Sequence, residues 1–160
     1  MDAGAAGGVT GRNMWLITGG CLSLAGAALH LGAIVGGGDW YRFFGAGEAM
    51  AQAAERGEAY PALITLGIAA ILALWAAYAF AGAGLIRRLP LMRTALVAIS
   101  VIYLLRGAVL VPALAVPAMG GTFNIVSSLI VLVYGLCYAV GTWLAWPQLS
   151  NRKYVDALDA

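Results

Sequence analysis

The stretch from residue 14 to residue 35, MWLITGGCLSLAGAALHLGAIV, decides the fold class of this protein. It contains no Asp, Glu, Lys or Arg, and as an α-helix it would be about 30 Å long. A helix of that length crosses the hydrocarbon core of a bilayer, so the stretch predicts a transmembrane helix. It is too long for the apolar core of a signal peptide, and we expect it to remain attached.

Three further apolar stretches follow at about 60–86, 92–116 and 123–146. The chain of 160 residues is 62% hydrophobic and only 10% charged, well below the charged fraction of soluble domains. Its 22 glycines and many alanines allow helices to pack closely in lipid, where hydrophobicity does not drive them together. We therefore predict an all-α membrane protein, a four-transmembrane-helix bundle formed by a single domain at residues 13–147.

The charged residues between the apolar stretches predict the orientation. One side of the membrane would carry six cations: Arg12, Arg87, Arg88, Arg93, Arg152 and Lys153. The other side would carry four carboxylates and two arginines: Asp39, Arg42, Glu48, Glu55, Arg56 and Glu58. The positive-inside rule makes the cationic side cytoplasmic, so we expect an N-in/C-in topology, with a flexible cytoplasmic tail at 1–12 and a cytoplasmic tail at 148–160. Eight arginines to one lysine, with abundant Ala and Gly, favour a bacterial source and a multi-pass protein of the inner membrane.

The segment between the first two stretches has an amphipathic pattern. After three glycines, Asp39 is a suitable N-cap, and apolar or small residues then repeat at helical spacing as far as Ala54. The remaining positions, which form the polar face, hold Arg42, Glu48, Gln52 and Glu55. We predict an amphipathic helix at about 39–56 that lies on the periplasmic surface.

Arg106 is the residue most informative about function, because an arginine well inside a membrane span costs at least ~2.5 kcal/mol. Counting along a helix from Arg93 places it roughly 20 Å above the cytoplasmic boundary. Such a cation needs a partner, and Glu48 or Asp39 of the surface helix is the partner we predict. The pair could equally be architectural and hold the surface helix on the bundle.

Polar residues of the other helices fall at a similar depth. Small and polar residues line one face of the first helix, where Ser23 and the lone histidine lie, and one face of the fourth helix, where Ser128 and Tyr138 lie. We predict a polar cavity in the periplasmic half of the bundle, with eight ligand-binding residues: His30, Asp39, Glu48, Tyr103, Arg106, Asn124, Ser127 and Tyr134. Close packing of helices with polar contacts between them explains the same faces without a cavity.

Several chemistries lack their motifs in this chain. There is no nucleophile elbow, no phosphate-binding loop and no metal-ligand spacing, and one histidine cannot supply both axial ligands of a haem. The sequence therefore names no catalytic residue, metal or cofactor, and it leaves open whether the protein is an enzyme. A net charge of +2 without a basic run does not predict a nucleic-acid partner. The partners we expect are the lipid bilayer and an amphipathic small molecule or lipid.

Three classes of function remain. The one we predict is binding or transport of an amphipathic or anionic small molecule in the cavity, with Arg106 as the anion partner. In the second class the protein is an accessory or oligomer-forming subunit, whose small-residue faces pack against copies of itself or a membrane partner subunit. In the third it is a membrane enzyme acting on a lipid-like substrate, with His30 or Glu48 as the acid-base group.

Overall fold

The computed structural model describes residues 12–116 and 121–150, and all regular structure within those ranges is α-helical. Within them, four helical stretches are long and apolar enough to cross a membrane: α1 (Met14–Phe43), α3 (Ala59–Gly82), α4 (Met92–Ala108) with its continuation α5 (Leu110–Ala115), and α6 (Thr122–Ser150). They correspond to the four predicted apolar stretches, so the chain is a multi-pass membrane protein. The predicted tails lie outside the described residues, apart from Arg12 and residues 148–150, which continue α6.

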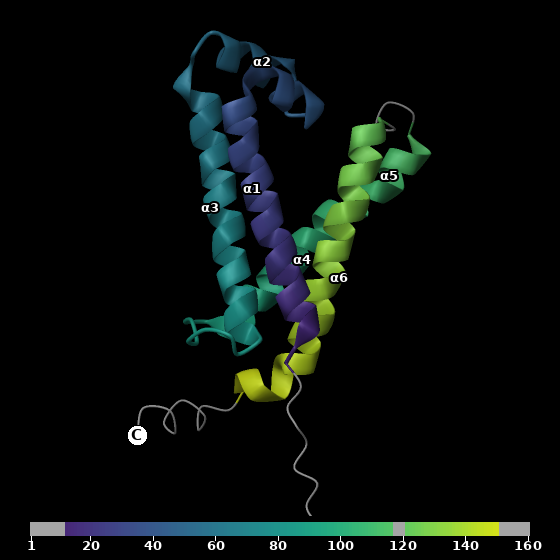
Figure 1. The fold of residues 1–160 in the computed structure, drawn as a ribbon. Coiled ribbons are helices and arrows are strands. Elements are labelled where there is room, and N and C mark those ends of the chain that lie inside the picture. Colours follow the sequence, from purple (N-terminus) through teal and green to yellow (C-terminus); the bar gives the residue numbers. More distant parts are fainter. Residues whose placement is uncertain (1–11, 117–120, 151–160) are drawn as a thin grey trace, which may run out of the picture.

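The long helices form two antiparallel pairs. α1 packs along α3, and α4 packs along α6, while the contacts between the two pairs are fewer and involve mainly α1 with α6. In Figure 1 the pairs meet near the end that holds the α3–α4 connection and diverge toward α2 and α5. The molecule is therefore closely packed at one end and splayed at the other.

The two ends of the bundle differ in charge. We call the closely packed end the basic end, because the arginines that precede α1 and that connect α3 to α4 lie there (Figure 1). We call the opposite end the acidic end, because its connecting segment carries four carboxylates and two arginines. That the basic end faces the cytoplasm stays a prediction from the positive-inside rule.

Glycines allow the close approach of α4 to α6. A Cβ at Gly107 would lie 2.7 Å from the Cα of Leu132, and a Cβ at Gly135 would lie 2.9 Å from the backbone nitrogen of Leu104. No real side chain tolerates such distances, so the two backbones can be this near only because both positions are glycine. Van der Waals contact of this kind holds helices together in lipid.

The segment after the first span differs from the predicted continuous helix at 39–56. α1 breaks at Gly37, where φ is 66° and ψ is −150°, and then resumes as far as Phe43. A turn follows, in which Gly45 has φ 67°, and α2 (Glu48–Glu55) begins after it. Because L-residues avoid positive φ, these glycines set where the helices break. The prediction of one helix is wrong: a continuous amphipathic pattern runs through two helices and a turn.

Candidate functional site

The eight residues predicted to line one cavity form separate groups in the structure. Asp39 and Glu48 contact Arg42 at the acidic end. Tyr103 and Tyr134 pack together where the helix pairs meet, with ring centroids 5.5 Å apart. The other residues occupy two further places on the helices. Arg106, Ser127 and Asn124 lie together on α4 and α6, and His30 bonds to the backbone of its own helix.

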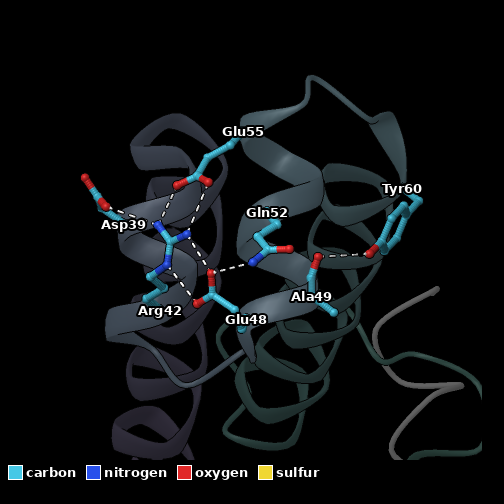
Figure 2. A network of polar contacts seen from close by, with 7 residues as sticks. All are labelled: Asp39, Arg42, Glu48, Ala49, Gln52, Glu55 and Tyr60. Carbon is cyan, nitrogen blue, oxygen red and sulfur yellow. Dashed lines mark hydrogen bonds and ion pairs between the residues drawn. The ribbon is translucent and has the colours of Figure 1, made fainter.

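Arg42 is the centre of the acidic-end group, which Figure 2 shows. Its guanidinium donates to both carboxylate oxygens of Glu48, at 2.8 and 2.9 Å, and to both of Glu55, at 2.5 and 3.1 Å. A longer contact of 3.4 Å joins it to Asp39. Since Arg42 follows the break in α1 and the two glutamates lie on α2, the group clasps α2 to the end of α1.

The arginine changes the acidity of the carboxyl groups that it binds. Hydrogen bonds from Arg42 lower the pKa of both Glu48 and Glu55, because they stabilise the carboxylate form. Gln52 donates a further hydrogen bond to Glu48 at 3.1 Å and lowers its pKa in the same way. The group is thus a charged network on the protein surface at neutral pH.

The predicted ion pair between Arg106 and Glu48 or Asp39 is wrong. Both carboxylates contact Arg42, which is close to them in sequence and reaches them without leaving the acidic end. The sequence contains a signal for the contact between Asp39 and Arg42, because the two are three residues apart, the spacing at which side chains on a helix meet. The amphipathic pattern places Arg42 on the polar face of the surface helix and does not indicate its other partners.

Arg106 instead binds two serine hydroxyls of α6. Its Nη1 donates to Ser128 Oγ at 2.9 Å and its Nη2 to Ser127 Oγ at 3.3 Å, while Ser127 donates to the backbone oxygen of Asn124. Ser128 is fully buried, whereas Arg106 is exposed. Among the residues that the structure describes, no carboxylate lies within 4.0 Å of this guanidinium. The hydroxyls orient the cation but do not neutralise it.

A buried hydroxyl network lies where the two helix pairs meet. Ser23 Oγ is 2.9 Å from both Tyr103 OH and Tyr138 OH, which joins α1 to α4 and α6. The ring of Trp75 on α3 packs edge-on against Tyr103, with centroids 4.8 Å apart. All four long helices therefore meet at Tyr103. Ser23, Ser128 and Tyr138 lie on the polar faces recognised in the sequence, but they are not among the eight predicted ligand-binding residues.

His30 is held by its own helix. Its Nδ1 lies 2.8 Å from the carbonyl oxygen of Gly26, and because a carbonyl only accepts, Nδ1 donates. In the neutral ring this leaves Nε2 as an acceptor. His, Cys, Asp and Glu side chains in the described ranges form no group of three that could hold a metal ion.

Two grooves of the structure are lined by residues other than Arg106 and His30. One, of about 470 Å³, runs between α4 and α6, and the other, of about 240 Å³, lies between the beginning of α1 and the end of α6. Neither has His30 or Arg106 in its lining. The cavity predicted in the periplasmic half has no counterpart in either groove.

Comparison of the chain with protein-family models, with curated proteins and with solved structures finds no match. A function for this protein therefore depends on the chemistry of its own side chains and on where the fold places them.

Proposed function

We propose that this protein binds an anionic amphiphile through Arg106, in the half of the bundle nearer the acidic end. The observation that carries the proposal is the state of that guanidinium. It belongs to a membrane-spanning helix, it is exposed, and its partners in the described part of the chain are two neutral hydroxyls. A cation in that setting gains free energy from any anion that reaches it.

The depth of Arg106 favours a ligand with a charged head and an apolar tail. Arg106 is fourteen residues from Met92, the first residue of α4, which corresponds to about 20 Å along the helix. The hydrocarbon core is about 30 Å thick, so the guanidinium can extend toward the headgroup level at the acidic end. An anionic headgroup could meet it there while the tail stays in lipid. A small hydrophilic anion would have to leave water instead.

The serines prepare the guanidinium for such a ligand. A guanidinium has five N–H donors, and Ser127 and Ser128 accept from two of them. The remaining donors suit a carboxylate or phosphate, which guanidinium groups bind through two parallel hydrogen bonds. Because the hydroxyls already hold the side chain in place, less conformational entropy is lost when the ligand binds.

The proposal is tested by titrating the purified protein with oleate and, as the neutral counterpart of the same chain, monooleoylglycerol, with bound ligand counted by native mass spectrometry. We expect Arg106→Met to weaken oleate binding at least about tenfold, since a hydrogen bond to a charged group contributes about 1.5–3 kcal/mol. Monooleoylglycerol binding should not change. Circular dichroism reports whether the variant keeps its helices.

Arg56→Met is the matched control, because it also removes one arginine, which pairs with Glu58 on the surface of the acidic end. An equal loss in both variants, or undiminished oleate binding in Arg106→Met, would overturn the proposal. If Arg106→Met does not fold, the double variant Ser127→Ala/Ser128→Ala replaces it. That variant keeps the charge but frees the guanidinium, and we expect severalfold weaker binding.

A further inference from the structure

The larger groove follows the seam between α4 and α6. Its lining repeats at intervals of three, four and seven residues on each helix, so one face of each contributes a wall. The lining residues are Val97, Ser100, Val101 and Leu104 of α4 and Ala139, Thr142, Trp143 and Trp146 of α6. The groove has a volume of about 470 Å³, and Trp143 in its wall is 81% exposed. It is an open, mainly apolar groove on the outside of the bundle.

The position of the groove along α4 places it among acyl chains. Val97 and Leu104 are five and twelve residues from Met92, which corresponds to about 7 and about 18 Å along the helix. One leaflet contributes about 15 Å of a hydrocarbon core of about 30 Å. By this measure the groove begins inside the leaflet at the basic end and reaches just past the middle of the core, so acyl chains are the molecules around it.

A cation stands at the basic-end mouth of this groove. Arg93 is one turn before Val97, and its guanidinium carbon lies 4.7 Å from the centroid of the Trp146 ring. Within the described ranges Arg93 makes no hydrogen bond or ion pair, and its Nε is buried without a partner. The indole holds the guanidinium by a cation–π contact, but that contact does not use the N–H donors. The cation thus remains available to an anion.

The wall of the groove also contains a hydroxyl without a partner. Thr142 is 4% exposed, and its Oγ1 is buried with no hydrogen bond to the described residues. Ser100, on the opposite wall, donates to the carbonyl oxygen of Leu96 at 2.7 Å. A buried hydroxyl usually has a hydrogen-bond partner, so Thr142 leaves an unsatisfied polar atom beside the groove.

We propose that the groove binds one anionic phospholipid of the leaflet at the basic end, with an acyl chain between α4 and α6 and the phosphate at Arg93. Other arginines of this end, among them Arg87 and Arg88, add positive potential that attracts acidic lipids. The positive-inside rule predicts that the basic end faces the cytoplasm. The cytoplasmic leaflet has a negative surface potential because it contains anionic lipids. The site is separate from Arg106 and does not depend on the function proposed for it.

Tryptophan fluorescence can test the site, because Trp143 and Trp146 line it. The protein, carrying Trp15→Phe and Trp40→Phe to reduce background, is titrated in micelles with phosphatidylglycerol or phosphatidylcholine whose chains are brominated and quench indole. One arginine near a membrane surface contributes about fivefold in affinity for acidic lipid. We therefore expect phosphatidylglycerol to quench at about fivefold lower concentration than phosphatidylcholine. Arg93→Gln should remove most of the difference.

Two further variants separate a binding site from general attraction. Arg87→Gln removes the same charge at the same end but lies outside the groove, so the preference for phosphatidylglycerol should remain. Ala139→Phe fills the groove and should reduce quenching by both lipids, and it keeps the test decisive if Arg93→Gln fails to fold. Arg106→Met should leave quenching unchanged, which distinguishes this site from the one proposed above.

Three results would overturn the lipid site. The first is quenching by phosphatidylglycerol and phosphatidylcholine at equal concentrations in the protein whose groove is unsubstituted. The second is an equal loss of preference in Arg87→Gln and Arg93→Gln, which would mean attraction to the surface only. The third is a dimer, detected by light scattering, that Ala139→Phe dissociates while lipid quenching persists; the occupant would then be a second copy of the chain.

Discussion

Arg42 and Arg106 both lie toward the acidic end of the bundle, but their charges are met in different ways. Arg42 follows the break in α1 and contacts three carboxylates. Arg106 belongs to a membrane span and binds two hydroxyls. In water, carboxylates approach a cation at little cost, whereas each carboxylate brought into a span would carry its own desolvation penalty. The first arginine is therefore suited to hold the fold together, and the second retains charge that a ligand can use.

The largest expected effect comes from disrupting the contact between α4 and α6, which positions Arg106. In Gly107→Leu the new side chain would collide with the backbone of Leu132, because even its Cβ would lie 2.7 Å from that residue's Cα. Overpacking costs about 1–3 kcal/mol, and a clash with backbone falls at the upper end of that range. We expect α4 to separate from α6 and oleate binding at Arg106 to be lost, while α2 remains clasped to α1. Thermal unfolding in detergent measures the loss of packing between α4 and α6. Hydrogen exchange of the α2 amides measures whether α2 remains clasped to α1.

Gly67→Leu is the matched control for that substitution. Gly67 is an exposed glycine in the middle of α3, and a Cβ there would meet nothing within 4 Å. The unfolding temperature of Gly67→Leu should stay near that of the unsubstituted protein. If both variants lose the same stability, close packing of α4 on α6 is not what positions Arg106.

A smaller effect is expected from removing Arg42, the centre of the acidic-end group. Arg42→Met removes the partner of Glu48 and Glu55 and leaves two carboxylates facing each other. We expect amide exchange in α2 to rise by roughly threefold to tenfold, since such surface contacts are individually weak. Oleate binding at Arg106 should be unchanged. Arg56→Met, which disturbs only the contact with Glu58, should leave exchange in α2 as it was. A fall in oleate binding in Arg42→Met would contradict the separation of the two arginines.

The smallest effect is the response of the acidic-end group around Arg42 to a fall in pH. Arg42 lowers the pKa of Glu48 and Glu55 below the ordinary value of 4.5, so their contribution to stability is fully present above that value. It is lost as the pH falls through the lowered pKa values of the folded protein. Exchange in α2, corrected for its intrinsic pH dependence, should accelerate modestly below about pH 4. In Glu48→Gln/Glu55→Gln this acceleration should disappear; if it persists, other groups cause it.

Part of the candidate site was predictable from sequence. Ser127 lies on the polar face of the fourth helix at the depth of Arg106, and the two side chains do meet. The depth of a residue follows from helical rise alone, so residues at one level can be recognised without coordinates. The partner of Glu48 was not predictable in this way, because the breaks at Gly37 and Gly45 turn α2 toward Arg42. Depth is a property of one helix, whereas an ion pair depends on how two segments are oriented.

The sequence by itself determined that this is a membrane protein with four spans, because the length and apolarity of a helix that crosses a bilayer are local properties of the chain. Only the tertiary structure decided which polar groups meet: that Arg42 binds the carboxylates, that Arg106 binds serines, and that Arg93 stands at the mouth of a groove. These contacts depend on the glycine positions where α4 approaches α6 and where α1 breaks. Such geometry is set by the packing of whole helices, in which each residue's partners come from distant parts of the chain.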